Sequence, residues 1–92
     1  MIRTIRHRGL KRLHDQGDAS RLRADQRERI RVALTMLDSA RSPDDLAVPG
    51  FRLHQLKGRL RGFWSMRITG NWRIVFRFDG DDVFDVDFVD YH

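Results

Sequence analysis

The sequence predicts an α+β domain, in which an antiparallel sheet from the second half of the chain is packed on one face by helices from the first half. Between residues 25 and 42 apolar side chains recur at helical spacing. Between residues 63 and 89 they alternate with polar or basic ones, as in half-buried strands. With 92 residues, 40% of them hydrophobic, the chain can build one modest core. Residues 1–92 are therefore expected to form a single domain.

The N-terminal segment is expected to contribute a short strand and a short helix. Ile2–Arg6 alternates apolar and basic residues, which is typical of a strand. Leu10 and Leu13 are three residues apart, so both would lie on one helical face. Gly17 is expected to end this helix.

A longer helix is predicted next. Asp25 is expected to cap it, with Glu28 completing a capping box. Pro43 disfavours helical geometry at the residue before it, so the helix should end near Ser42. Its apolar face needs a partner surface. That face is made of four side chains: Ile30, Ala33, Leu34 and Leu37.

The partner surface is expected from strands in the second half of the chain. Gly70-Asn71, between two alternating segments, is a signal for a tight hairpin turn. In order, the expected elements are a strand or strand end at Phe51–Leu56, a basic turn at Gly58–Gly62, hairpin strands at Phe63–Thr69 and Trp72–Asp79, and a last strand at Val83–Val89.

Alternation within the hairpin separates two faces of the sheet. Arginines occupy one face, which should be left open and basic. The other face would be covered by the helices, and it carries Trp64, Met66, Ile68, Trp72, Ile74, Phe76 and Phe78. Since Trp64 and Trp72 are in phase with this apolar face, core packing is favoured over base stacking for both. The pattern leaves the facing of Phe51 and Phe63 open.

The charge distribution points to a polyanionic partner. The net charge is +5, and residues 51–78 hold seven basic side chains and no acidic one, whereas residues 79–92 hold six aspartates and no lysine or arginine. A field of this kind concentrates phosphates, although a basic surface without a ligand would look the same. The chain has no cysteine, which fits a reducing cytoplasm. No apolar stretch approaches the roughly 20 residues of a membrane span, so a cytoplasmic location without membrane contact is expected.

The same segments carry side chains suited to RNA cleavage. Attack of a ribose 2′-hydroxyl on its phosphate needs a proton acceptor, cations for the phosphorane and a donor for the departing 5′-oxygen. The candidates are His54, Lys57, Arg73, Asp90, Tyr91 and His92.

Each candidate also has a structural interpretation. His54 could be a histidine on the sheet surface, and Lys57 a solvated turn lysine. Arg73 could pair with Asp85 or Asp87 across the last strand, and the chain end could be frayed. No glycine-rich phosphate loop, serine nucleophile elbow, calcium loop or zinc-ligand spacing is present. No cofactor or metal is therefore expected.

Four ordered blocks make the chain similar to a known family. They are Leu53–Gly58, which reads L-H-Q-L-K-G, then Gly62–Ser65, Asn71–Ile74 and the terminal Asp90–His92. In this order and spacing they resemble HigB-type toxins of the RelE/ParE superfamily, the plasmid-maintenance killer proteins. The resemblance covers essentially the whole chain. Phe51 and Phe63 depart from it, because tyrosine is common at both positions in relatives.

The resemblance implies a RelE-like microbial RNase fold and a metal-independent endoribonuclease that acts as the toxin of a type II toxin–antitoxin system. Such a toxin cleaves messenger RNA in the A site of the 70S ribosome, in contact with ribosomal RNA, and so inhibits translation. It also implies a HigA-type helix-turn-helix antitoxin, through which the toxin would meet operator DNA indirectly.

By position, the resemblance also assigns roles to the site residues. Lys57 and Arg73 would hold the scissile phosphate, and Tyr91 would stack on or orient a nucleotide. The acid–base candidates are His54, Asp90 and His92. Further RNA contacts are expected from Arg59, Arg61, Arg67 and Arg77.

Two other functions remain open at this point. The first is a basic nucleic-acid-binding module without catalysis, which would use the same arginines for phosphates alone. The second is a ParE-like inhibitor of DNA gyrase, although His54 and the terminal Tyr91-His92 favour RNA chemistry.

Overall fold

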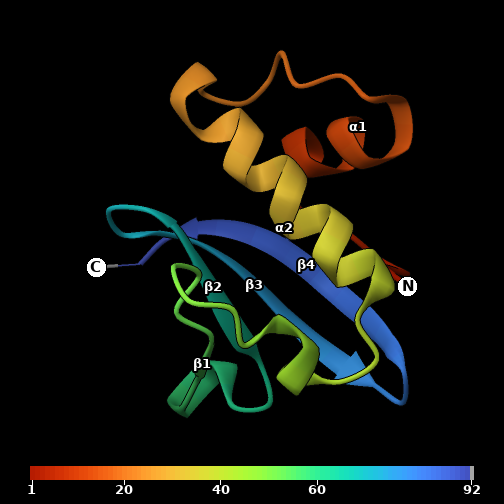
Figure 1. The fold of residues 1–92 in the computed structure, drawn as a ribbon, viewed down its shortest axis with the longest axis vertical. Coiled ribbons are helices and arrows are strands. Elements are labelled where there is room, and N and C mark those ends of the chain that lie inside the picture. Colours follow the sequence, from red (N-terminus) through yellow and green to blue (C-terminus); the bar gives the residue numbers. More distant parts are fainter. Residues whose placement is uncertain (92) are drawn as a thin grey trace.

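The computed structural model describes residues 1–91 and confirms the α+β architecture, with helices on one face of a four-stranded sheet (Figure 1). The helices are α1 (Arg8–Gln16) and α2 (Arg27–Ser39), and the strands are β1 (His54–Gln55), β2 (Trp64–Thr69), β3 (Trp72–Asp79) and β4 (Asp82–Asp90). Short 3₁₀ turns lie at Ala24–Gln26, Pro43–Leu46 and Gly58–Leu60. No helix of residues 1–91 has the length and apolar character that crossing a bilayer requires.

The sheet is antiparallel throughout, in the order β1-β2-β3-β4. The hairpin turn at Gly70-Asn71 is as predicted, and it aligns Met66 with Ile74 across β2 and β3. The strand predicted at Ile2–Arg6 is reduced to two isolated parallel bridges, from Ile2 to Val83 and from Ile5 to Val86. The N-terminal segment therefore follows the outer side of β4 without forming a regular strand.

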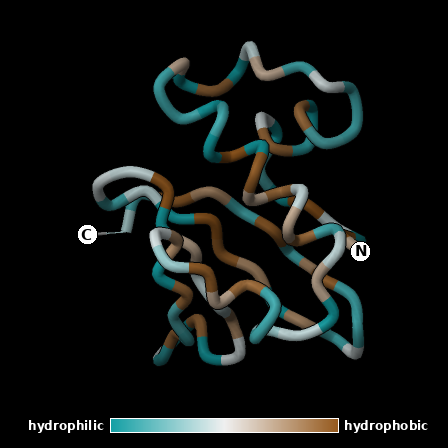
Figure 2. The backbone as a smooth tube through the Cα atoms, viewed as in Figure 1, coloured by the Kyte–Doolittle hydropathy of each residue, from teal (hydrophilic) through white to brown (hydrophobic). Residues whose placement is uncertain are grey.

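The core lies between the helices and the sheet, where Figure 2 shows hydrophobic stretches of both. The predicted apolar face of α2 is confirmed, because Ile30, Ala33 and Leu37 are fully buried and Leu34 is nearly so. Trp64 and Trp72 are half-buried and pack against this core, which confirms the core role over a stacking surface. The core also contains Phe51, Met66, Ile68, Ile74, Phe76, Val83, Val86 and Phe88.

The first helix ends as predicted, but the capping box predicted for the second is wrong. Gly17 adopts a left-handed conformation (φ 71°), and its N–H donates to carbonyls of the last turn of α1. By contrast, α2 begins at Arg27 without a side-chain cap. The carboxylate of Asp25 instead accepts hydrogen bonds from Arg23 at 2.8 and 3.1 Å, and the chain enters α2 through the 3₁₀ turn. The arginine thus competes successfully for the capping side chain.

A hydrogen-bond network holds the N-terminal segment and both helices together. His14 of α1 contacts the carboxylate of Asp38 of α2 at 2.8 Å and that of Asp15 at 3.0 Å. The other oxygen of Asp38 accepts a hydrogen bond from the backbone N–H of Ile2 at 3.0 Å. One aspartate therefore fixes three segments relative to one another.

This network should make the stability of the protein depend on pH near neutrality. Burial opposes protonation of His14, but its hydrogen bonds with Asp15 and Asp38 outweigh burial and raise its pKa above 6.5. A raised pKa stabilises the fold fully below the unfolded pKa, and this contribution is lost as the pH rises through the folded pKa. The urea concentration at the midpoint of unfolding should thus decrease as the pH is raised from about 6 to about 8. The decrease should be smaller in His14→Gln, and an unchanged pH dependence in that variant would contradict the assignment.

Candidate cleavage site

Three of the predicted site residues meet in one groove on the sheet face opposite the helices. The groove has a volume of about 300 Å³. Its lining residues are Arg52, His54, Leu56, Ser65, Arg73 and Tyr91. The groove thus receives side chains from β1 and its flanks, from β2, from β3 and from the end of β4. His54, Arg73 and Tyr91 are far apart in the sequence and converge only because the strands are adjacent.

The strand register explains this convergence. His54 lies opposite Ser65 in the β1–β2 ladder, and Ser65 lies opposite Val75 in the β2–β3 ladder. Arg73 is two residues before Val75 and therefore lies on the same face of β3. The backbone N–H of Tyr91 donates to the carbonyl of Asn71 at 2.8 Å, which holds the chain end beside the β2–β3 turn. The Arg73 guanidinium is 6.0 Å from the centroid of the Tyr91 ring.

A small apolar layer lies at the base of the groove. Part of the sheet face that was predicted to be open and basic is therefore apolar and buried. Leu56 and Val75 are each only 3% exposed, yet neither belongs to the core cluster beneath the helices. Ser65, beside them, is 1% exposed, and its hydroxyl has no hydrogen-bond partner among residues 1–91. The base of the groove therefore combines the apolar Leu56 with the buried hydroxyl of Ser65, and Arg52, His54 and Arg73 also line the groove.

The other predicted site residues lie around this groove. Lys57 directly follows Leu56, is exposed, and stands at the start of the Gly58–Leu60 turn, outside the set of described residues that line the groove. Asp90 ends β4 opposite Trp72 and is exposed, immediately before Tyr91. His92 lies outside the described residues.

Among the arginines predicted to bind RNA, two are engaged within the protein. Arg77 donates to the carboxylate of Asp85 at 2.7 Å and lies over the Phe84 ring at 5.0 Å. The hydrogen bond from Arg77, with the charge of Arg6, lowers the pKa of Asp85. Pairing with the last strand, considered for Arg73, thus takes place at Arg77. The guanidinium of Arg67 donates to the carbonyl of Gly70 at 3.1 Å and supports the hairpin turn.

The other two arginines predicted to bind RNA take part in no ion pair among residues 1–91. Arg59 and Arg61 are both exposed, in and directly after the Gly58–Leu60 turn. This turn follows Lys57, so three exposed basic residues lie at alternate positions in the segment that follows β1.

Sequence reasoning missed Arg52 and Ser65. Arg52 was counted only as part of the positive charge of residues 51–78, and its backbone φ of 47° has no local signal such as glycine or asparagine. Ser65 alternates with the apolar residues of β2. This alternation predicts on which face of the sheet Ser65 lies, but it does not predict that Ser65 is buried. Its position between Trp64 and Met66, in a block shared with the family, was the one available signal.

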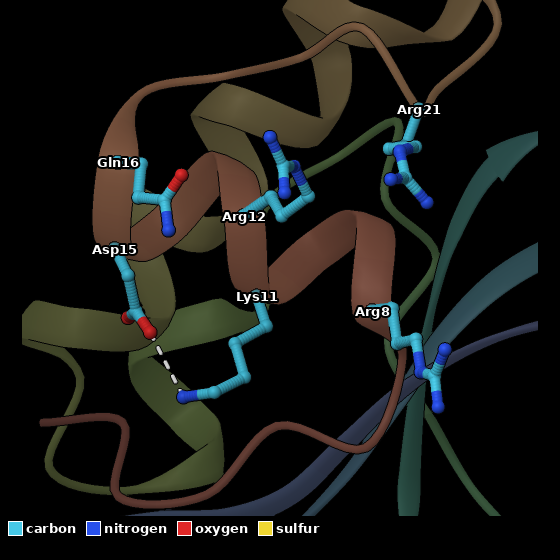
Figure 3. A pocket seen from close by; sticks show the side chains of 6 residues that line it. All are labelled: Arg8, Lys11, Arg12, Asp15, Gln16 and Arg21. Carbon is cyan, nitrogen blue, oxygen red and sulfur yellow. Dashed lines mark hydrogen bonds and ion pairs between the residues drawn. The ribbon is translucent and has the colours of Figure 1, made fainter.

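A second hollow of about 300 Å³ lies on the outer side of α1, and Figure 3 shows its side chains. Its lining residues are Arg8, Lys11, Arg12, Asp15, Gln16 and Arg21. Lys11 pairs with Asp15 at 2.8 Å, and Arg12 pairs with Asp18 at 2.8 Å. This hollow offers partly neutralised charge and neither histidine nor tyrosine, so the groove on the sheet is the candidate site for cleavage.

Comparisons with known proteins agree with the fold and the blocks described above. The family model described as "RelE-like toxin of type II toxin-antitoxin system HigB" matches residues 3–92. Endoribonuclease HigB of Proteus vulgaris is 37% identical over 92 residues, which is 100% of both chains. Toxin HigB-1 of Vibrio cholerae is 38% identical over 45 residues, 48% of this chain and 47% of that protein. The resemblance inferred from four sequence blocks is confirmed, and the chain belongs to the HigB-like family of RelE-like toxins from type II toxin–antitoxin systems.

Proposed function

We propose that this toxin is a ribosome-dependent endoribonuclease that cuts messenger RNA in the sheet-face groove. The observation that supports this most is the meeting of His54, Arg73 and Tyr91 in one groove. An imidazole for proton transfer and a cation for the phosphorane are among the groups that RNA cleavage through the 2′-hydroxyl needs, and an aromatic ring can stack on a base beside the reacting phosphate. The name of the Proteus vulgaris relative, an endoribonuclease, points to the same chemistry.

In the proposed reaction the 2′-oxygen of one nucleotide attacks the adjacent phosphorus. The bond from phosphorus to the 5′-oxygen of the next nucleotide breaks, which leaves a 2′,3′-cyclic phosphate and a 5′-hydroxyl. Arg73 neutralises the negative charge that develops on the phosphate oxygens, with Lys57 at the groove margin. Tyr91 stacks on a base next to the scissile phosphate.

Proton transfer is assigned to a set of groups at the two ends of the groove. One group must take the proton from the 2′-hydroxyl, and another must give one to the 5′-oxygen. His54 lies in β1 and Asp90 ends β4; His92, which lies outside the described residues, completes the set. We assign the two roles to this set, with Arg59 and Arg61 binding phosphates further along the strand.

The ribosome would position the messenger RNA for cleavage. A groove of this size that is open to solvent supplies charge and proton transfer but little to align a flexible RNA strand for in-line attack. Holding the reacting atoms in place is worth several orders of magnitude in rate. The A site of a 70S ribosome would hold the messenger RNA, with ribosomal RNA contacting the basic surface, so the toxin would act in the cytoplasm. A HigA-type helix-turn-helix antitoxin would neutralise it and bring it indirectly to operator DNA.

The proposal is tested by mapping messenger-RNA 5′ ends in a translating extract. Wild-type toxin should create new ends within reading frames, and no cuts should appear when ribosomes are omitted. His54→Ala should reduce the cuts by roughly 10²–10⁴-fold, the usual contribution of a positioned acid or base. Arg31→Ala, an exposed change on α2, is the control and should cut like wild type.

The same experiment separates the alternatives. Binding to ribosomes or RNA without any new ends would favour a non-catalytic basic module. Inhibition of DNA supercoiling by gyrase, with messenger RNA intact, would favour a ParE-like activity and reject the nuclease.

A further inference from the structure

Arg52 is the one basic residue of the groove that neither the sequence motifs nor the family blocks single out. It lies at the groove wall beside His54, and its side chain is exposed. Among residues 1–91 it takes part in no ion pair, so its charge is available to a ligand.

The backbone of Arg52 is held in a conformation that a residue with a Cβ rarely adopts. Its φ is 47°, in the left-handed region. Asp85, the other non-glycine residue with positive φ among residues 1–91, is held by its own contacts. Its N–H donates to Thr4 at 2.7 Å and its carboxylate accepts from Arg77 at 2.7 Å. Among residues 1–91 Arg52 forms no such hydrogen bond or ion pair, so its conformation depends on its neighbours.

The neighbour that imposes it is anchored from the helix layer. Phe51 is buried in the core, and its carbonyl accepts a hydrogen bond from the backbone N–H of Arg67 at 2.6 Å. Arg29 of α2 lies over the Phe51 ring at 4.2 Å. Its guanidinium also donates to the carbonyl of Arg67 at 3.0 Å and to that of Gly50. Arg29 thus links residues 50 and 51 to β2. Arg52 is the next residue along the chain, and its side chain lines the groove.

We propose that Arg52 is a further phosphate-binding residue of the cleavage site, and that Arg29 is the positioning residue that holds it there. This inference rests on the proposed nuclease function and extends it by one RNA contact. Arg29 itself is occupied by two carbonyls and one ring, so it acts through residues 50–52 and does not touch the RNA. The phosphate bound by Arg52 is one next to the scissile phosphate, on the β1 side of the groove.

The first test replaces Arg52 in the full-length toxin and measures cleavage of one messenger RNA in a reconstituted translation system. Arg52→Gly removes the charge and suits a positive φ, so the thermal midpoint should be unchanged or higher. Its cleavage rate should nevertheless fall at least about tenfold, with a weaker dependence on salt because one phosphate contact is lost. Arg52→Lys should keep part of the activity, and Arg41→Gln, an exposed arginine beyond α2, should behave like wild type.

The outcomes are distinct. Wild-type toxin that makes no cuts rejects the proposed function and this inference with it. Wild-type toxin that cuts, together with Arg52→Gly that cuts equally well with the same salt dependence, overturns the inference and leaves the nuclease intact.

A double-mutant cycle tests the positioning role of Arg29. Arg29→Lys keeps the charge but cannot serve two carbonyls and a ring together, so cleavage should fall. If Arg29 acts through Arg52, the pair Arg29→Lys with Arg52→Gly should cleave no worse than Arg52→Gly alone. The loss of thermal stability caused by Arg29→Lys should, in contrast, be the same in both backgrounds. Cleavage defects that multiply would show that Arg29 acts independently and would overturn the positioning role.

Discussion

Arg73→Ala is expected to reduce messenger-RNA cleavage by roughly 10²–10³-fold, the usual loss when one preorganised donor to a developing anion is removed. Arg73 projects from a strand whose backbone is paired on both sides, to Arg67 and to Val89. Its Cα is therefore fixed by the sheet, and its guanidinium is preorganised toward the groove. The charge on the phosphate oxygens is greatest in the transition state, so kcat should fall more than KM rises.

Two further variants sharpen this prediction. Arg73→Lys keeps the charge but loses paired hydrogen bonds to two phosphate oxygens, so it should fall between wild type and Arg73→Ala. The thermal midpoint should stay near that of wild type in both, because Arg73 is half-buried on the groove side, away from the main core. Cleavage by Arg73→Ala at the wild-type rate would remove Arg73 from the site.

Phe76→Ala is expected to lower the free energy of unfolding by about 3–5 kcal/mol, as phenylalanine-to-alanine changes in well-packed cores do. Phe76 is 0% exposed, lies opposite Trp64 in the β2–β3 ladder and contacts the Phe78 ring edge-on with centroids 6.0 Å apart. Because small domains have only about 5–15 kcal/mol in total, much of the variant could be unfolded at 37 °C.

Urea unfolding of Phe76→Ala and Phe84→Ala provides the comparison. Phe84 is half-buried on the other face of the sheet, beside Arg77, so its loss should cost clearly less. Equal losses for the two variants would mean that the layer beneath the helices is not the main source of stability.

The hairpin could be predicted from the sequence because its signals are local. Alternation from Trp72 to Asp79 predicted β3 with the bounds that the structure has. The apolar stripe of α2 was equally clear, since the spacing of Ile30, Ala33 and Leu37 repeats with the helix period. Within the site, His54, Arg73 and Tyr91 were selected through the family blocks. Residue chemistry alone left a structural role open for each of them.

The features that the sequence did not reveal depend on which of several possible partners a side chain binds. Asp25 has the right residue type and spacing for a helix cap, but its carboxylate accepts a hydrogen bond from Arg23 instead. Either Arg73 or Arg77 could have paired with Asp85, but Arg73 lies opposite Val89, four residues from Asp85, whereas Arg77 lies opposite Phe84, the residue next to Asp85. The left-handed backbone of Arg52 directly follows Phe51, whose ring lies against Arg29 of α2, in a segment more than twenty residues away.

The two outer borders of the sheet differ in a way that bears on solubility. Along β4 the first residues of the chain occupy the free backbone groups, with hydrogen bonds from Arg3 to Val83 at 2.8 Å and from Arg6 to Val86 at 2.7 Å. The opposite border consists of β1, only two residues long and next to a cluster of cations. Exposed strand borders invite pairing with other copies, and short, charged ones resist it. A toxin produced in excess of its antitoxin should therefore resist edge-to-edge assembly into larger sheets.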